Sequence, residues 1–409
     1  MSNKKKSKLF LTGKITEEKL SFLINKVVDF AFFGEKFKFY LSHALFSSFD
    51  VDEGTKLLLK TIAQKINLDK TVYVKDIGAG VGIIGICLKK RFPQLAVTFT
   101  DRDMLALDFT KINCKFNDIK EYQLSGELGI ETITSKYDFI VSNIPAKIGD
   151  KGIEDLIKGI LLSLNLNGIC AIVVIKPLEK IIRKILSENN AIVAFEEEGQ
   201  AHWVFHFTSS ENRDTTEKLP DVLEPYIRDT VMQKNFGFLY KLKTVYNLPD
   251  FNTLGYQSEL LLELLESEKP GGTCLFWNPL QGHIPVIVHK MFPEKISKYI
   301  LAGRDLLQLK IAQDNLELNG VSKESISINH VSLISEVTEP VQNHIIIPDI
   351  IPMVNIHDVL FKNLQARNIF VSDKSTNIFR LLETQKTFQT RKRIKRNGFT
   401  GVFLTNPNS

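Results

Sequence analysis

A short apolar run that enters a glycine-dense turn and then a helical pattern constrains the fold of this chain more than any other stretch. Residues 73–85 read YVKDIGAGVGIIG. The apolar start predicts a buried parallel strand, and the isoleucines after the turn predict the packed face of a helix. Gly78, Gly80 and Gly82 remove side chains where the backbone must bend sharply and approach a ligand closely. The helix start behind them offers unpaired N–H groups, so the turn is predicted to be a binding site.

Two kinds of cofactor compete for this turn. The glycines at 80, 82 and 85 fit the dinucleotide pattern G-x-G-x-x-G, which is weak evidence when it stands alone. Against it, Asp76 ends the first strand, and Asp101 ends the second strand in VTFTDRD. Two carboxylates at these strand ends suit a cofactor with a cationic amino-acid tail and a ribose but no pyrophosphate. A turn that merely packs a helix on a strand is the structural alternative.

The arrangement resembles motifs I and II of class I S-adenosylmethionine-dependent methyltransferases. The resemblance implies that S-adenosyl-L-methionine is the cofactor and that Asp76 and the turn from Gly78 through Gly80 to Gly82 hold its methionine end. It also implies that Asp101 binds the ribose hydroxyls.

A second motif lies before the glycine turn. Leu45, Phe46 and Ser47 are followed by Asp52, Gly54, Thr55 and three leucines at 57–59. This phrase is similar to the segment that precedes the cofactor strand in the small methyltransferase domain family. That family includes guanine-N2 methyltransferases of ribosomal RNA, which implies an amino nitrogen of RNA as the methyl acceptor.

Glu127 follows a predicted short strand over 122–125. In the family an acid near this point contacts the adenine amino group, so the resemblance implies the same contact for Glu127. A carboxylate in a solvent-exposed loop remains the alternative.

The catalytic stretch is expected at 137–147, YDFIVSNIPAK. Asn143 stands at the carboxyl end of an apolar strand, where open α/β sheets bind ligands. The stretch resembles motif IV of amino-group methyltransferases, N-P-P-(Y/F), in which the asparagine and the following carbonyl accept hydrogen bonds from the target NH2. Asn143 and Pro145 are retained, whereas Ile144 replaces the first proline and Ala146 the aromatic residue.

The missing aromatic ring leaves the acceptor open, because stacking on a flipped base contributes roughly 1–3 kcal/mol in nucleic-acid sites. Phe46, Trp203 and Phe205 are candidate substitutes or core residues. A protein or small-molecule amine is the alternative acceptor. A non-catalytic RNA- or protein-binding module on the same fold is the alternative function.

The second half of the chain repeats the sequence pattern of the first. A chain of 409 residues is too long for one ordinary hydrophobic core, so two domains are expected. A constant offset of 202 aligns Asn278 with Asp76, Leu280 with Gly78 and Gly303 with Asp101. The second copy has therefore lost its ligands, and it is predicted not to bind the cofactor. In two-domain ribosomal RNA guanine-N2 methyltransferases the active copy comes second, whereas here it comes first.

These patterns predict an α/β fold with two tandem Rossmann-like class I methyltransferase domains. Each has a mostly parallel seven-stranded sheet that ends in an antiparallel hairpin. The expected divisions are a basic tail with an amino-terminal helix at 1–34, a catalytic domain at 35–212 and a degenerate domain at 216–409. The helix itself is expected over 17–33.

Composition excludes several other classes of protein. Apolar residues make up 44% and charged residues 24%, and no run approaches the ~18 apolar residues of a membrane span. The four cysteines are widely spaced, which indicates reduced thiols in a cytoplasmic protein without a zinc site. The net charge of +5 permits an RNA partner without requiring one, and the oligomeric state is not indicated.

A basic cluster near the carboxyl end offers a further RNA contact. It comprises Arg391, Lys392, Arg393, Lys395 and Arg396. Strand alternation places residues 391, 393 and 395 on one face, which could follow a phosphate backbone together with the lysines at 4–6. An edge strand protected by charge explains the same residues.

Overall fold

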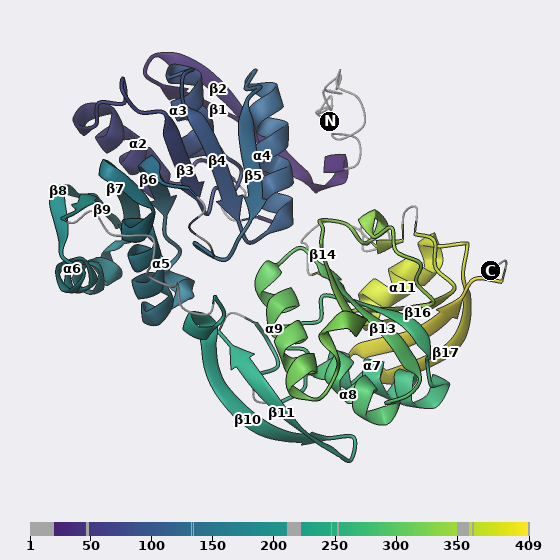
Figure 1. Ribbon diagram of the computed structural model, residues 1–409. Coiled ribbons are helices and arrows are strands. Elements are labelled where there is room, and N and C mark those ends of the chain that lie inside the picture. Colours follow the sequence, from purple (N-terminus) through teal and green to yellow (C-terminus); the bar gives the residue numbers. More distant parts are fainter. Residues whose placement is uncertain are drawn as a thin grey trace, which may run out of the picture.

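The computed structural model describes residues 20–45, 49–131, 133, 135–210, 222–246, 248–251, 253–349, 360–361 and 364–407. These residues form two domains, each built on a seven-stranded sheet with helices on both faces (Figure 1). The strand orders are β5-β4-β3-β6-β7-β9-β8 and β14-β13-β12-β15-β16-β18-β17. In each sheet only the strand next to the edge, β9 or β18, runs antiparallel to its neighbours. The predicted fold is therefore confirmed.

The first domain contains nine strands and five α-helices among its described residues. Its strands are β1 (Ile24–Phe32), β2 (Glu35–Ser42), β3 (Tyr73–Ile77), β4 (Ala96–Asp101), β5 (Tyr122–Gly126), β6 (Tyr137–Asn143), β7 (Leu164–Ile175), β8 (Ala191–Glu198) and β9 (His202–Ser209). Its helices are α2 (Glu53–Lys65), α3 (Ile83–Arg91), α4 (Met104–Phe116), α5 (Asp150–Ser163) and α6 (Glu179–Glu188).

The second domain repeats this plan with fewer described helices. Its strands are β10 (Ile227–Asn235), β11 (Phe238–Val245), β12 (Gly272–Trp277), β13 (Ile296–Gly303), β14 (Ile326–His330), β15 (Asn343–Ile346), β16 (Asn368–Lys374), β17 (Gln389–Arg396) and β18 (Phe399–Thr405). Its helices are α7 (Tyr256–Glu268), α8 (His283–Met291), α9 (Leu306–Leu318) and α11 (Ser375–Thr384).

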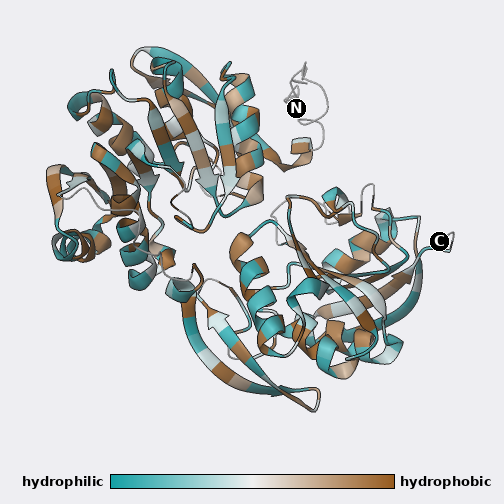
Figure 2. Cartoon of the chain, in the orientation of Figure 1, coloured by the Kyte–Doolittle hydropathy of each residue, from teal (hydrophilic) through white to brown (hydrophobic). Residues whose placement is uncertain are grey.

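The first sheet buries apolar side chains on both of its faces. Figure 2 shows hydrophobic residues in its strands, interrupted by polar ones. One face packs on α2, α3 and α4 through residues such as Leu58, Ile86 and Phe109. The other face packs on α5 and α6 through residues such as Ile157 and Ile182. The carboxyl ends of the strands remain available for a site.

The predicted helix over 17–33 is wrong where the structure describes it. From Ile24 the chain forms the hairpin β1–β2, which turns at Phe33 and Gly34 with φ of 50° and 77°. A two-residue turn with positive φ at both positions matches the twist of paired strands. The predicted boundary at residue 35 therefore cuts a hairpin, and the boundary near 215 lies outside the described residues.

Each hairpin is attached to its domain by a buried asparagine. The Asn113 side chain accepts a hydrogen bond from the Tyr40 backbone N–H at 2.8 Å and donates to the carbonyls of Tyr40 and Val81. Asn315 makes the same set of contacts with Lys243 and Gln281 in the second domain. These matching contacts confirm the duplication at the level of single side chains.

The register of the duplication differs from the predicted constant offset of 202. Gly82 and Gly282 both precede a helix and have φ of 84° and 88°, so the offset through the glycine turn is 200. Strand β13 has eight residues where β4 has six, and from this strand onward the offset is 202. The two extra residues lie in β13, after the glycine turn. The similarity between the two halves of the sequence does not show where they are inserted.

The corrected register changes which residues replace the predicted ligands. Phe276, and not Asn278, occupies the position of Asp76. Asn278 occupies the position of Gly78, and Leu280 that of Gly80. The prediction that the copy has lost its ligand residues is unchanged.

The two domains meet at the carboxyl ends of their central strands. The Met104 N–H donates to the Arg304 carbonyl at 2.9 Å, and the Leu306 N–H donates to the Arg102 carbonyl at 3.0 Å. Asp103 and Asp305 thus form an antiparallel bridge across an approximate two-fold relation between the domains. The site edge of the first sheet therefore faces the corresponding edge of the second.

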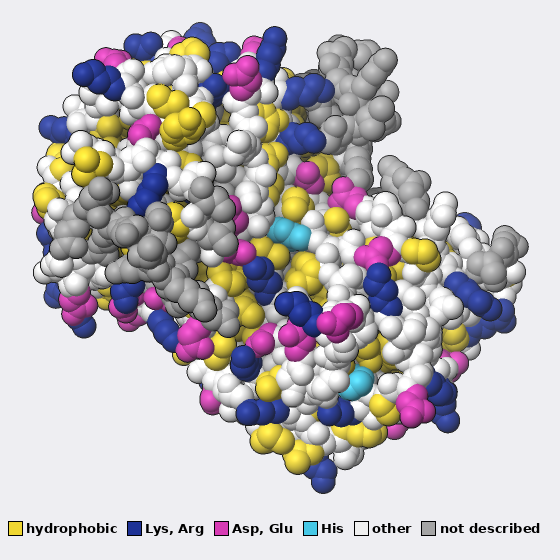
Figure 3. Space-filling model, in the orientation of Figure 1, with side chains coloured by type: hydrophobic (Ala, Val, Ile, Leu, Met, Phe, Trp, Pro, Cys, Tyr) yellow, Lys and Arg dark blue, Asp and Glu magenta, His cyan; other side chains and the backbone are white. Residues whose placement is uncertain are grey.

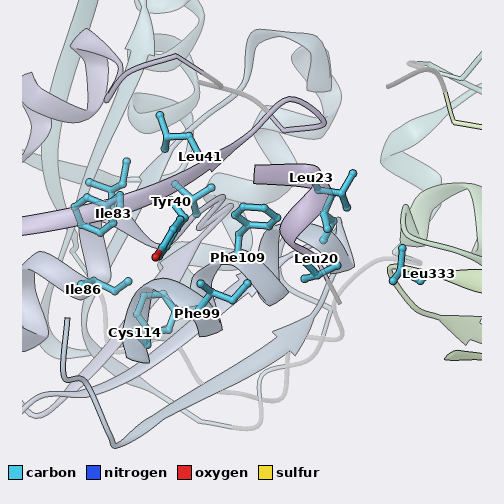
Figure 4. Packing of buried hydrophobic residues seen from close by; sticks show 14 of the residues in the cluster. Leu20, Leu23, Tyr40, Leu41, Ile83, Ile86, Phe99, Phe109, Cys114 and Leu333 are labelled. Carbon is cyan, nitrogen blue, oxygen red and sulfur yellow. The ribbon is translucent and has the colours of Figure 1, made fainter. Parts of the chain in front are cut away.

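Apolar contacts extend this junction. Leu20 and Leu23 lie on the side of the first domain that is nearest to Leu333 of the second domain (Figure 4), and all three belong to one buried cluster. Leu128 packs with Leu307 in another shared cluster. The two domains consequently share core residues, so separating them would expose apolar surface.

The helices in the described part of the chain are all too short or too polar to cross a bilayer.

Candidate active site

The glycine turn leaves open space above its backbone. Gly78, Gly80 and Gly82 have φ of 68°, 59° and 84°, values that L side chains rarely adopt. A Cβ atom added at Gly78 or Gly80 would meet no other atom within 4 Å, whereas one at Gly82 would lie 2.8 Å from Thr110. The first two glycines therefore face open space, and the third packs the turn against α4.

Asp76 lies beneath this turn. Its carboxylate has no exposed surface, and its Oδ2 accepts a hydrogen bond from the Gly85 N–H at 2.9 Å. Its Oδ1 is buried without a hydrogen-bond partner. Burial raises the pKa of Asp76 to about 7, against the opposing effect of the Gly85 N–H and with a further increase from Asp101. Asp76 thus shapes the turn from below through its hydrogen bond with the Gly85 N–H.

The raised pKa predicts that Asp76 makes the folded state less stable as the pH rises. Between about pH 4 and pH 7 the unfolded state loses this proton while the folded state keeps it, so the free energy of unfolding falls with increasing pH. Between pH 5 and pH 8 we expect the free energy of unfolding of Asp76→Asn to fall by roughly 2–3 kcal/mol less than that of the wild type. Urea unfolding of both proteins across this range measures the difference.

Burial also raises the pKa of Asp103 to about 7, and this group contributes equally to the wild type and to Asp76→Asn. The difference between the two stability curves therefore reports Asp76 alone. Parallel stability curves for the two proteins would contradict the assignment to Asp76.

Asp101 meets the turn from the neighbouring strand. Its Oδ2 accepts the Gly80 N–H at 2.9 Å, and its Oδ1 accepts the Asp103 N–H at 2.9 Å. Burial raises the pKa of Asp101, and these two N–H groups oppose the increase. Each carboxylate oxygen can accept a second hydrogen bond, so hydroxyl groups can bind here without breaking the existing contacts. The structure therefore brings Asp101 and Gly80 together, as the sequence predicted.

Glu127 forms an ion pair with a buried lysine. Its Oε2 lies 2.7 Å from Nζ of Lys75, whose side chain is 4% exposed on the central strand. The Lys75 ammonium also lies 5.6 Å from the centre of the Tyr137 ring. Glu127 is mostly buried, so the alternative of a solvent-exposed loop carboxylate is wrong. Its predicted contact with adenine remains a prediction.

We expect Glu127→Gln to lower the free energy of unfolding by about 3 kcal/mol, because it leaves Lys75 buried without an opposing charge. The double variant Lys75→Met/Glu127→Gln should recover part of this loss. Chemical denaturation measures both effects. A large loss of cofactor affinity with unchanged stability would instead support the adenine contact as the main role of Glu127.

Asn143 ends strand β6 beside the amino terminus of α2. Its Nδ2 donates to Oδ2 of Asp52 at 3.0 Å and to Oγ1 of Thr55 at 3.2 Å. The backbone after it is fixed by the Ile144 N–H, which donates to the Val173 carbonyl at 3.0 Å. Pro145 follows at the exposed surface. The sequence placed Asn143 at this edge but gave no role to Asp52.

Two of the three candidate aromatic platforms lie away from Asn143. Phe205 is fully buried, and Trp203 stacks on it with a centroid separation of 6.3 Å. Both belong to the cluster on the α5 and α6 face, whereas Asn143 contacts α2 on the opposite face. They are packing residues, and Phe46 lies outside the described residues.

The corresponding turn of the second domain is closed by its own side chains. The Leu280 N–H donates to Oε1 of Gln308 at 3.2 Å, and Nε2 of Gln308 donates to Oδ1 of Asn278 at 3.3 Å. Asn278 also donates to the Ile347 carbonyl at 2.9 Å. A Cβ added at Gly303 would lie 2.9 Å from Asn278. Polar side chains thus occupy the space that is open in the first domain.

Arg304 of the second domain reaches the edge of the first domain's site. Its Nη2 donates to the Ala44 carbonyl at 2.9 Å and lies 3.5 Å from Oδ2 of Asp103. Ala44 precedes the segment that carries the second sequence motif. Sequence reasoning missed this contact, because nothing in the chain signals that residues 260 positions apart meet.

The strand order of the first sheet is that of the class I methyltransferase fold. The glycine turn after β3 and Asp101 at the end of β4 also agree with this fold. Residues 36–201 match the family model described as "Methyltransferase small domain". The match covers most of the amino-terminal domain and none of the second.

Curated relatives resemble part of the chain. Ribosomal RNA small subunit methyltransferase C of Haemophilus influenzae (strain PittGG) is 36% identical over 115 residues, which cover 27% of this chain and 32% of the relative. The protein of the same name from Actinobacillus pleuropneumoniae serotype 7 (strain AP76) is 33% identical over 129 residues, covering 31% of this chain and 38% of the relative. The matches thus span about a third of these relatives.

A solved structure resembles nearly the whole chain. The 16S rRNA N2 methyltransferase of Thermus thermophilus, solved in complex with AdoMet and guanosine, aligns with a TM-score of 0.64. The alignment covers 95% of this chain and 99% of that one at 15% identity. At this identity the likeness establishes the two-domain fold.

Proposed function

We propose that this protein is an S-adenosylmethionine-dependent methyltransferase that modifies an amino nitrogen of RNA, of the ribosomal RNA guanine-N2 type. The difference between the two glycine turns carries the proposal. In the first domain Gly78 and Gly80 open onto free space beside Asp101, whereas Gln308 and Asn278 fill the equivalent space in the second. The names of the curated relatives, ribosomal RNA small subunit methyltransferases, support methyl transfer to ribosomal RNA.

The residues of the first domain fit this cofactor. The bare backbone at Gly78 and Gly80 admits a ligand, and Asp101 can accept hydrogen bonds from ribose hydroxyls. Asp76, beneath the turn, has a buried Oδ1 without a hydrogen-bond partner, and a cation bound above the turn would favour its ionised form. When bound, S-adenosylmethionine supplies a methyl group that a positively charged sulfur activates for displacement. Pro145 lies at the surface next to the site and limits the backbone conformation after Asn143.

Asn143 is proposed to orient the acceptor. Its Oδ1 and the Ile144 carbonyl accept hydrogen bonds from the target NH2, which directs the nitrogen lone pair away from these two acceptors. The chemistry then depends on positioning and fixed dipoles, without a strong base. The absence of an aromatic residue at Ala146 means that base stacking must come from another residue or from the RNA itself.

RNA contacts are proposed for the junction and for the edge strand β17. Side chains of both charges gather along the junction between the domains (Figure 3), so the surface there is not uniformly basic. On β17, Lys392 lies 3.6 Å from Glu268 and Arg396 lies 2.6 Å from Glu263. The exposed face of the strand carries Arg391, Arg393 and Lys395, which agrees with the predicted alternation.

A non-catalytic binding module is the second candidate, because the NIPA sequence departs from motif IV at two positions. Incubating the full chain with cofactor labelled in the methyl group, together with total RNA and protein extract, separates the candidates. Label in RNA supports the proposal, and label only in protein would contradict the RNA acceptor. Tight cofactor binding with no transfer to any fraction would favour the binding module.

A further inference from the structure

The side-chain amide of Asn143 has a fixed orientation in the structure. Its Nδ2 donates to two acceptors at the start of α2, Oδ2 of Asp52 at 3.0 Å and Oγ1 of Thr55 at 3.2 Å, which lie on the same side of the amide nitrogen. An amide orientation is normally inferred from its partners. Here the partner settles it, because a carboxylate can accept from the NH2 group but not from the amide oxygen.

The two oxygens of Asp52 have separate partners. Oδ1 caps α2 by accepting the N–H groups of Gly54 at 2.8 Å and Thr55 at 3.3 Å. Oδ2 accepts the Thr55 hydroxyl at 2.5 Å as well as the Asn143 amide. Because the Thr55 hydroxyl gives its hydrogen to Asp52, its oxygen can only accept from Asn143. Helix capping alone would need only the first oxygen.

We propose that Asp52 is a positioning residue that, with Thr55, turns the Asn143 amide so that Oδ1 faces the methyl acceptor. The inference rests on the proposed function, in which Asn143 accepts hydrogen bonds from an NH2 group. A flipped amide would present a donor to another donor and would set its oxygen against the Asp52 carboxylate. The carboxylate thus selects the only amide orientation that can bind an amino group.

The second domain supplies an internal comparison. At its equivalent positions, Gly255 precedes helix α7 where Asp52 precedes α2, and Ile347 follows β15 where Asn143 ends β6. Ser258 keeps a hydroxyl at the position of Thr55, and it donates to Asp250. The domain that has lost the amide has also lost the acid at the N-cap position, and a carboxylate from another position, Asp250, accepts the Ser258 hydroxyl and the Gly255 N–H instead.

The decisive variant is Asp52→Asn in the full chain. Asparagine has the same size and caps helices as well as aspartate, so a role limited to capping predicts methyl transfer within about two-fold of wild type. In the positioning role, the new NH2 group would face Asn143 and flip its amide. We then expect kcat to fall at least about a hundred-fold, with cofactor affinity and melting temperature nearly unchanged.

The double variant Asp52→Asn/Asn143→Asp restores the pattern of donor and acceptor. The amide introduced at position 52 is then the donor, and the carboxylate at position 143 accepts from it while presenting its other oxygen to the acceptor. Activity at least about ten-fold above that of Asp52→Asn is expected. Activity of Asp52→Asn near wild type, or a double variant no better than both single variants, would overturn the proposal.

A readout that does not need methyl transfer separates this inference from the proposed function. In NMR spectra of 15N-labelled protein, one side-chain amide proton of Asn143, identified by its absence in Asn143→Asp, should be shifted downfield and exchange slowly. The shift should disappear in Asp52→Asn, and its persistence would refute the positioning role. If wild type shows this signal but transfers no methyl group to RNA, the proposed function fails while the amide orientation stands.

Discussion

Replacing Asn143 with alanine will reduce methyl transfer about a hundred- to a thousand-fold while leaving cofactor affinity within about two-fold of wild type. The expected loss is that of removing one preorganised acceptor from the reacting group. Cofactor affinity should survive because Asn143 contacts Asp52 and Thr55, whereas the glycine turn is held by Asp101 and Thr110. Single-turnover transfer rates and calorimetric binding constants measure the two quantities separately.

Asn165→Ala is the matched control. Asn165 donates to Asp138 at 2.6 Å near the start of β7, at the opposite end of the sheet from Asn143. This control should transfer methyl groups at nearly the wild-type rate. Unchanged turnover in Asn143→Ala would remove Asn143 from the mechanism.

Gly80→Leu will weaken cofactor binding at least about a hundred-fold while the protein remains folded. The second domain shows that the turn accepts this change, because Leu280 occupies the equivalent position with φ of 52°, close to the 59° of Gly80. A leucine in this conformation costs roughly 1–2 kcal/mol, and a Cβ atom added at Gly80 would meet no other atom within 4 Å. The side chain would then occupy the space proposed for the ligand.

Gly34→Leu controls for backbone strain in this comparison. Gly34 also has a positive φ, 77°, and an added Cβ there would meet no atom within 4 Å. It lies in the β1–β2 hairpin turn, away from the glycine turn. Melting temperatures should fall similarly in both variants, and cofactor affinity only in Gly80→Leu. Equal affinity in Gly80→Leu and wild type would place the cofactor elsewhere.

The sheet and most helices could be predicted because their patterns are local. The spacing of its apolar residues predicts helix α4. Asp103 caps the helix by accepting the Leu105 N–H at 3.0 Å. The hairpin over 24–42 was missed because its apolar residues also fit a helical period. The deciding signal was the turn at Phe33 and Gly34, which demands positive φ at both positions.

The sequence predicted only those site residues that come directly after a predicted strand. Asp101 and Gly80 come together because neighbouring parallel strands end at one edge of the sheet. Asp52 lies 91 residues from Asn143, and no period or spacing relates the two. The predicted offset of 202 was wrong at the glycine turn for a similar reason. The two extra residues of β13 change the alignment of the two domains, and no sequence pattern marks them.

We expect the first domain alone to hold S-adenosylmethionine, against Asp101 and the turn from Gly78 to Gly82. A crystal structure of the full chain with the cofactor, paired with calorimetry for the stoichiometry, tests this. One molecule per chain is expected, with its ribose on Asp101 and no density at the turn formed by Asn278 and Leu280. Failure to bind, or a molecule seated in the second domain, would contradict it.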